Sequence, residues 1–299
     1  MENIPTMPLW QRWLSPQELV KEKEHAGEIQ ILDTRLFAEE IAAIYAGKGT
    51  KSEQRAALLG LSKARLSEGR KALEGGLARD RDGAVYVGAH AILIDRLIGG
   101  LFAAAENYVF AIKARFALMA VGGYGRGELA PQSDIDLLFV MPQRHKKSDA
   151  EFVEFILYLL WDLGLMVGHA SRTVHQNIAA ASDDITICTS LLEMRRIAGA
   201  AAVSKQMIST FKHWLANQSA GYFVEAKLAE RDQRHARFGG TRYAVEPNVK
   251  DGKGGLRDLH TLFWISKYAY RLEHIYGILG AGILRPSEAR AFASSQRFL

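Results

Sequence analysis

Two short apolar runs, separated by glycines and charges, stand out near the middle of the chain. Residues Phe116–Met141 read FALMAVGGYGRGELAPQSDIDLLFVM, and apolar runs of this length between turn signals predict buried strands. A weaker third strand is expected at Met166–Val174, beside the strand that Asp134 and Asp136 introduce, after a helix at Glu151–Leu165. The middle of the chain is therefore predicted to alternate strand, helix and strand.

Elsewhere the apolar residues recur at helical spacing. A first helix is expected to begin at Pro16, with Ser15 as its N-cap. The remaining predicted helices are Asp33–Tyr45, Lys51–Leu77, Ala89–Ala114, Ile185–Ile197, Ala202–Leu215, Tyr222–Arg237, Asp258–Tyr276 and one from Pro286. Gly239–Gly255 interrupts this pattern with five glycines and a proline, and a loop of that length is typical of a functional segment.

Composition narrows the class of protein. The 299 residues are 48% hydrophobic, no apolar run approaches the roughly 18 residues that span a bilayer, and the N-terminus does not resemble a signal peptide. A cytoplasmic protein with no membrane partner is expected. The single cysteine, Cys188, excludes an internal disulfide framework and is more typical of a buried apolar residue than of a nucleophile. The net charge of +5 is scattered among acids, which favours a phosphate-rich substrate or an acidic partner over nucleic acid.

Asp134 and Asp136 are the candidate chemical groups at the start of the second strand. Alternation along a strand places both side chains on one face, roughly 6–7 Å apart. Two such carboxylates suit Mg²⁺, which prefers oxygen ligands and shares its coordination sphere with substrate phosphates. The alternative is that Ser133 and Asp134 cap a turn and Asp136 is a solvated strand residue.

The preceding glycines favour the metal and nucleotide interpretation. Gly122, Gly123, Gly125 and Gly127 permit positive φ and close backbone approach, so that successive amide groups can form a nest for phosphate oxygens. Arg126 lies among them as a possible charge partner for a triphosphate. The segment has neither the GK[ST] ending of a P-loop nor the third glycine of a dinucleotide fingerprint.

These residues carry a resemblance to a known family. Gly122-Gly123 followed by Asp134-x-Asp136 at the head of a strand resembles the signature of the DNA polymerase β-like nucleotidyltransferases. The longer string GGYGRGELAPQSDIDLLF is similar to the nucleotidyltransferase domain of the bifunctional uridylyltransferase/uridylyl-removing enzymes that modify the PII nitrogen-regulatory protein. Further matching segments are Thr189–Glu193, Arg195–Gly199, Glu230–His235 and Glu246–Asp258.

The resemblance implies transfer of UMP from UTP to a tyrosine hydroxyl of PII, with Mg²⁺ or Mn²⁺ and release of pyrophosphate. Asp134 and Asp136 would bind the metal, and Gly122, Gly123 and Ser133 would contact the triphosphate. It also implies an α+β fold: a polymerase β-like core, with a small mixed sheet and helices, between helical regions. The expected domains are residues 1–85, helical; 86–180, the nucleotidyltransferase core; and 181–299, helical and ending before a hydrolase domain.

One departure from the superfamily concerns a third carboxylate, which commonly stands on a later strand. Met166–Val174 contains none. Glu246 is the candidate replacement, with Asp251 and Asp258 as alternatives, although Asp258 could equally be an ordinary carboxylate at a helix start. The basic side chains nearby would suit the triphosphate or an acidic partner, or could be solvated loop charges; they are Lys250, Lys253 and Arg257.

Two other functions stay open at this stage. The same chemistry could serve a small-molecule acceptor or an RNA end, although no RNA-binding motif is present. The glycine segment and the Asp pair could also belong to a nucleotide-sensing module without catalysis, which the missing third carboxylate leaves possible.

Overall fold

A computed structural model of the chain describes residues 16–25, 29–238, 246, 248–272 and 282–298. The predicted N-cap at Ser15, most of the first half of Gly239–Gly255 and the end of the predicted helix Asp258–Tyr276 lie outside these residues. The chain forms two compact units. We call the one from Leu14 to Phe211 the sheet unit and the one that contains the residues from Lys212 onward the C-terminal unit.

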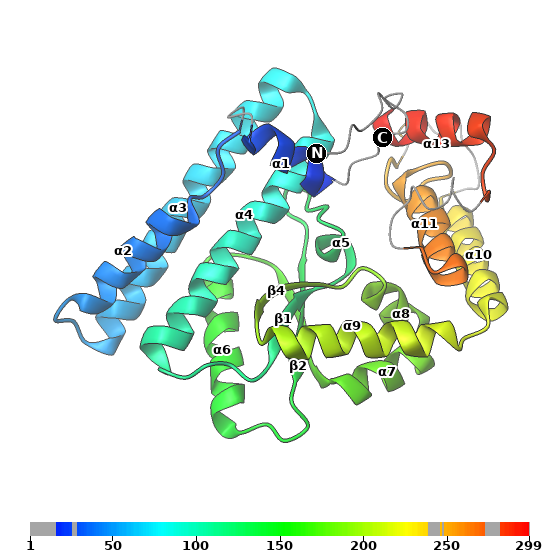
Figure 1. The fold of residues 1–299 in the computed structure, drawn as a ribbon. Helices are drawn as coiled ribbons and strands as arrows, with labels where there is room; N and C mark the ends of the chain where they lie inside the picture. Colours follow the sequence, from blue (N-terminus) through cyan, green and yellow to red (C-terminus); the bar gives the residue numbers. More distant parts are fainter. Residues whose placement is uncertain (1–15, 26–28, 239–245, 247, 273–281, 299) are drawn as a thin grey trace, which may run out of the picture. The chain divides into compact units, whose positions relative to one another are not determined.

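The sheet unit is built on a four-stranded mixed sheet in the order β3-β2-β1-β4, of which Figure 1 labels β2, β1 and β4. The central strand β1 pairs antiparallel with β2 and with β4, whereas β2 pairs parallel with β3. The bounds are β1 Ala117–Ala120, β2 Ile135–Met141, β3 Val167–Thr173 and β4 Arg195–Gly199. This confirms the predicted α+β fold, the first three strands, and the position of the third strand beside the one that carries Asp136.

The fourth strand was not predicted. The expected helix Ile185–Ile197 ends early, because α8 covers only Ile185–Leu191 and residues 195–199 turn back to pair with β1. The prediction of helix at 195–197 is therefore wrong. β4 is an edge strand that is only partly buried, so it lacks the apolar run that marks a central strand. It also lies beyond residue 180, the predicted end of the core.

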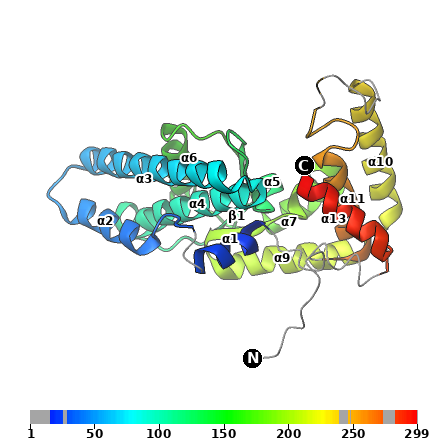
Figure 2. The ribbon, with the colours of Figure 1, turned by 90° about the horizontal axis from the view of Figure 1, so that it is seen from above.

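The N-terminal helices belong to the same unit. They are α1 Pro16–His25, α2 Thr34–Ala46, α3 Lys51–Asp80 and α4 Gly83–Ala104, which continues as a π-helical turn at Ala105–Val109. In both views α2, α3 and α4 lie side by side (Figures 1 and 2). The Asp33 carboxylate caps α2, and Thr50 with Glu53 forms a capping box on α3, which satisfies amide groups that a helix start leaves free.

The helix expected at Ala89–Ala114 differs at both ends. α4 begins at Gly83, six residues earlier than Ala89, and Asp82 caps it through the amide of Val85. The helix ends at Val109, and Ala111 has a φ of 50°, a left-handed conformation that no helix interior contains.

Helix α4 and its continuation also bear on the expectation about membranes. Among the described residues, Gly83–Val109 is the one segment that is long and apolar enough to cross a bilayer. The prediction that no apolar run approaches about 18 residues was therefore wrong. However, 67% of its apolar window is buried inside the protein, as in the core helix of a globular fold.

The core of the sheet unit lies on one face of the sheet. There, Leu118, Leu137 and Phe139 pack with α4 and with α6, Lys147–Asp162. Side chains alternate along a strand, so Asp136 and Leu138 point to the opposite face. The carboxylate is thus on the face away from the main core.

Two further helices, α7 Val174–Asp183 and α9 Ala201–Ala216, complete this part of the chain; α7 was not predicted. The C-terminal unit contains α10 Ala220–Arg237, α11 Leu256–Tyr270 and α13 Pro286–Phe298. Helices α10 and α11 pack through Phe223 and Tyr268, whose rings stack with centroids 3.9 Å apart.

Candidate active site

The glycine-rich segment forms a tight turn between β1 and β2. Gly122 has a φ of 60° and opens the one-turn helix α5, Gly122–Gly125. The amides of residues 125–128 all donate to carbonyl groups of residues 121–124, so they close the turn on itself. A phosphate nest can therefore draw only on amides earlier in the turn, such as those of Gly122 and Gly123.

Gly125 has a packing role. A Cβ atom at this position would overlap the backbone carbonyl of Glu193 and lie 3.2 Å from the carbonyl oxygen of Ala120. Only glycine lets the turn lie this close to the segment that follows α8, and a nucleotide contact at Gly125 stays a prediction.

The Asp136 carboxylate lies between two glycines. A Cβ atom at Gly122 would come within 2.9 Å of its Oδ2, and one at Gly168, on β3, would come within 2.9 Å of its Oδ1. The parallel register pairs Asp136 with Gly168 directly, and the amide of Val121 donates to the Asp136 carbonyl at 3.1 Å. Both flanks of the carboxylate thus lack a side chain.

The surroundings of the Asp136 carboxylate disfavour its negative charge when no cation is bound. Burial raises the pKa of Asp136, and the nearby charge of Asp134 raises it further. Asp134 precedes β2 and is exposed. Two carboxylates with like charge, one half-buried, form a donor set that fits a hard divalent cation.

No third carboxylate lies beside Asp134 and Asp136 among the described residues. In this part of the chain, no group of three or more Asp, Glu, His or Cys side chains is placed to hold a metal ion. Asp258 accepts from Arg234, His235 and the amide of Gly254. It lies in the first turn of α11, as the ordinary helix-start interpretation expects.

The other predicted contacts from the late loop are in the C-terminal unit. Glu246, Lys250 and Lys253 are exposed there, and Asp251 forms an ion pair with Arg257 at 3.5 Å. The Asn248 side chain accepts from the amides of Lys250 and Asp251 and so orders this turn. A role for Glu246 as a metal ligand, or for the two lysines as triphosphate contacts, stays a prediction.

Two more predicted residues lie in the sheet unit. Arg126 forms an ion pair with Glu128 at 3.0 Å, and only 9% of the Arg126 side chain is exposed. Ser133 is exposed, and its amide donates to Ala130. Both lie between β1 and β2, and their contacts with a nucleotide stay predictions.

Ser190 is a neighbour of the site that the sequence did not single out for a role. Its Oγ lies 3.8 Å from the point where a Cβ of Gly122 would stand. It comes from α8, and the only sequence signal was that residues 189–193 match the family. A hydroxyl therefore lies close to the glycine turn on the side of Asp136.

A polar network around the buried Tyr124 holds the centre of the glycine turn. The Tyr124 hydroxyl donates to Asp95 on α4 at 2.6 Å. Arg195 on β4 donates to both oxygens of Asp95, at 2.6 and 2.9 Å, and to the backbone carbonyl of Tyr124 at 3.1 Å. Its guanidinium also lies over the Tyr124 ring, 5.1 Å from the centroid. Three distant parts of the chain thus meet at one residue of the turn.

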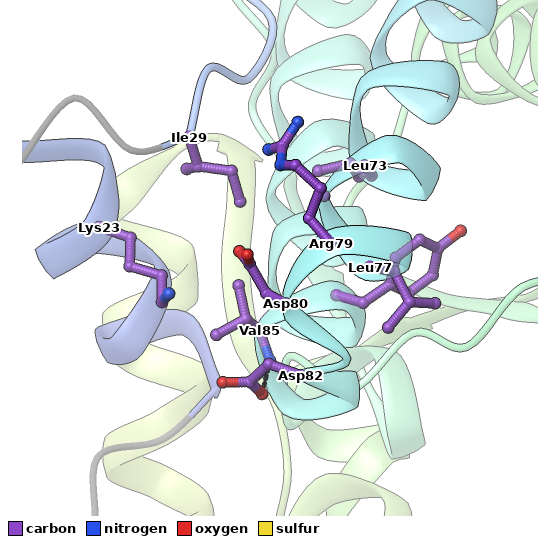
Figure 3. A pocket seen from close by; sticks show the side chains of 10 residues that line it. Lys23, Ile29, Leu73, Leu77, Arg79, Asp80, Asp82 and Val85 are labelled. Atoms are coloured by element: carbon purple, nitrogen blue, oxygen red, sulfur yellow. Dashed lines mark hydrogen bonds between the residues drawn. The ribbon is translucent and has the colours of Figure 1, made fainter.

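A small cavity lies away from the Asp pair. It lies among α1, α3 and α4, measures about 20 Å³, and is lined by residues such as Lys23, Leu73, Asp80 and Asp82 (Figure 3). This volume admits about one water molecule, far less than a nucleotide. The chemistry indicated by the Asp pair therefore has no connection with this cavity.

Comparison with known proteins agrees with this geometry. Residues 110–173, which contain the glycine turn and the Asp pair, match the family model described as "Nucleotidyltransferase domain". Residues 222–299 match the model "GlnD PII-uridylyltransferase".

Curated relatives named "Bifunctional uridylyltransferase/uridylyl-removing enzyme" match most of the chain. The protein of Rhodopseudomonas palustris is 44% identical over 274 residues, which are 89% of this chain and 29% of the relative. The protein of Nitrobacter hamburgensis is 42% identical over 94% of this chain and 31% of its own length. That of Azospirillum brasilense is 41% identical over 90% of this chain and 29% of its own.

This chain is a homologue of the bifunctional uridylyltransferase/uridylyl-removing enzymes. It spans just under a third of the length of these relatives. The sheet unit contains the whole nucleotidyltransferase match, and the C-terminal unit contains the whole uridylyltransferase match.

Proposed function

We propose that this chain carries out metal-dependent transfer of UMP from UTP to a tyrosine hydroxyl of a PII-type regulatory protein. The observation that carries the proposal is the Asp136 carboxylate between Gly122 and Gly168, next to the glycine turn. The names of the homologues support the choice of donor base and acceptor.

The residues divide into two functions. Asp134 and Asp136 would hold a divalent cation, Mg²⁺ or Mn²⁺, which when bound would neutralise phosphate charge and lower the pKa of the attacking hydroxyl. The amides of Gly122 and Gly123 receive triphosphate oxygens, which approach closely because neither residue has a side chain.

The reaction is a displacement at the α-phosphorus. The tyrosine oxygen forms a bond to this phosphorus while the bond to the bridging α–β oxygen breaks. Pyrophosphate leaves with the electron pair of the broken bond, and the hydroxyl proton passes to solvent. Because the protein forms no covalent bond itself, its contribution is positioning and charge stabilisation.

The test is pyrophosphate release from each of the four ribonucleoside triphosphates, with Mg²⁺ or Mn²⁺, with and without a PII protein. We expect release only with UTP and PII, together with a mass gain on PII that equals UMP. Asp134→Asn is the control: it removes one charge and little volume, and its release should fall to background while its fold is retained.

Two results would contradict the proposal. Turnover retained in Asp134→Asn would remove the Asp pair from the mechanism. Metal-dependent UTP binding without release under any acceptor would favour a nucleotide-sensing module.

A further inference from the structure

Tyr124, the middle residue of the glycine turn, forms hydrogen bonds with α4 and β4, two elements outside the candidate site. Tyr124 is 1% exposed, and its hydroxyl and carbonyl both bond within the Asp95–Arg195 network. Asp95 lies 29 residues before Tyr124, and Arg195 lies 71 residues after it. The turn is therefore fixed from α4 on one side and from β4 on the other.

We infer that Asp95 and Arg195 are positioning residues that hold the glycine turn in its nucleotide-binding conformation through Tyr124. Neither is adjacent in sequence to a predicted site residue. The inference rests on the proposed function, because it gives the turn a nucleotide to bind.

The energetics explain why such a network would fix one conformation. Burial alone would lower the pKa of Arg195, but Asp95 raises it, so the two charges depend on each other. Burial and the charge of Asp95 raise the pKa of the Tyr124 hydroxyl well above its usual value, so it stays a hydrogen-bond donor. A largely buried ion pair tolerates few arrangements, because moving one partner leaves the other charge poorly compensated.

The backbone around Tyr124 is equally constrained. Gly125 lies against the carbonyl of Glu193, two residues before Arg195, and the amide of Gly125 donates to Val121 at 2.9 Å. Because this backbone leaves little room, we expect a shift of Tyr124 to displace the neighbouring amides of Gly122 and Gly123 relative to the Asp136 carboxylate.

A neighbouring ion pair provides a matched control. Arg96, the next residue on α4, donates to both carboxylate oxygens of Glu24 on α1 at 2.7 Å. The exposed fractions are similar: 26% and 28% for Arg96 and Glu24, against 23% and 20% for Arg195 and Asp95. Glu24→Gln therefore removes a comparable interaction from the same helix through a side chain that is not part of the Asp95–Arg195 network, although α1 also lies against Gly127 through Gln17.

The experiment compares Tyr124→Phe, Asp95→Asn and Glu24→Gln in the 299-residue chain. We expect Tyr124→Phe to raise the KM for UTP about three- to tenfold with kcat within about twofold, because nucleotide binds only the fraction of turns in the competent conformation. Asp95→Asn should show a larger rise in KM. Glu24→Gln should lower the melting temperature and leave the KM for UTP unchanged.

Hydrogen exchange of residues 121–129 without substrate provides a second readout that does not depend on the transfer reaction. We expect faster exchange in Tyr124→Phe and wild-type exchange in Glu24→Gln. If the wild type transfers nothing, the proposed function fails, yet the exchange data still test the positioning of the turn. Unchanged exchange and unchanged KM in Tyr124→Phe would overturn the inference, even if Asp95→Asn does not fold.

Discussion

Asp136 and Asp258 are both half-buried carboxylates, but their surroundings shift their pKa in opposite directions. Burial and Asp134 raise the pKa of Asp136. Burial would also raise the pKa of Asp258, but the Gly254 amide, His235 and Arg234 outweigh it and lower the pKa. The protein thus satisfies Asp258 itself, whereas Asp136 is stabilised by nothing comparable among the described residues. A carboxylate kept in an unfavourable state is typical of a site that awaits a ligand.

Replacing Asp136 and Asp258 each by asparagine is the most direct test of the difference between them. Asp136→Asn should reduce nucleotide transfer by on the order of 10³-fold, because it removes charge stabilisation at the reacting phosphates. Its melting temperature should equal or exceed that of the wild type, since the substitution relieves repulsion with Asp134. Transfer assays and calorimetry measure both quantities, and a marked loss of stability would assign Asp136 a structural role.

The glycines that flank Asp136 allow a finer test. Gly168→Ala places a Cβ atom 2.9 Å from Oδ1 of Asp136, which must then move. We expect transfer to fall by roughly 10- to 100-fold, the usual effect of disturbing a metal ligand from its neighbours.

Gly60→Ala is the matched control for that variant. Gly60 is an exposed position of α3, and outside the helix's own neighbouring backbone no atom lies within 4 Å of an added Cβ, so alanine should stabilise the helix by up to about 1 kcal/mol and leave transfer unchanged. Equal activity of the two variants would show that the space beside Asp136 is not required.

Asp258→Asn should affect stability instead. It weakens the acceptor for Arg234, His235 and the Gly254 amide, and we expect a loss of about 1–3 kcal/mol in the free energy of unfolding. Urea unfolding of the variant against the wild type measures this loss. An unchanged midpoint of urea unfolding would mean that these contacts make no net contribution to stability.

The smallest and most specific expected effect is the pH dependence of the difference in unfolding free energy between the wild type and Asp258→Asn. The lowered pKa of Asp258 means that its stabilisation is complete above the unfolded value, about 3.9, and is lost as the pH falls through the lower folded value. The difference between wild type and Asp258→Asn should therefore be constant above about pH 4 and shrink below it. A difference that already changes well above pH 4 would contradict the assignment of this pH dependence to Asp258.

Local signals in the sequence predicted much of the sheet unit. The apolar runs indicated β1 and β2, alternation placed Asp136 on one face, and helical spacing gave α2 and α3 nearly to their ends. The predicted helix Glu151–Leu165 was shifted, because α6 begins four residues earlier and ends three residues earlier. Local signals failed where pairing decides the structure. The segment Arg195–Gly199 has two arginines and little apolar content, and it is a strand only because β1 has a free edge to pair with.

The candidate site divides in the same way. Asp134, Asp136 and the glycines are within 15 residues of one another and were found from their pattern. Gly168 and Asp95 could not be found from a sequence pattern, because only the register of β3 and the packing of α4 bring them to the turn. No spacing rule connects residues whose separation the tertiary fold determines.

The position of β4 also has a consequence for how this protein is made. β1 is the second strand from the edge, and its outer neighbour is synthesised some 75 residues after it. During translation β1 and β2 can pair early, but one side of β1 stays open, with free backbone groups that other chains can bind. A fragment that stops at residue 180 would keep this open edge permanently, so one meant to remain monomeric should extend past Gly199.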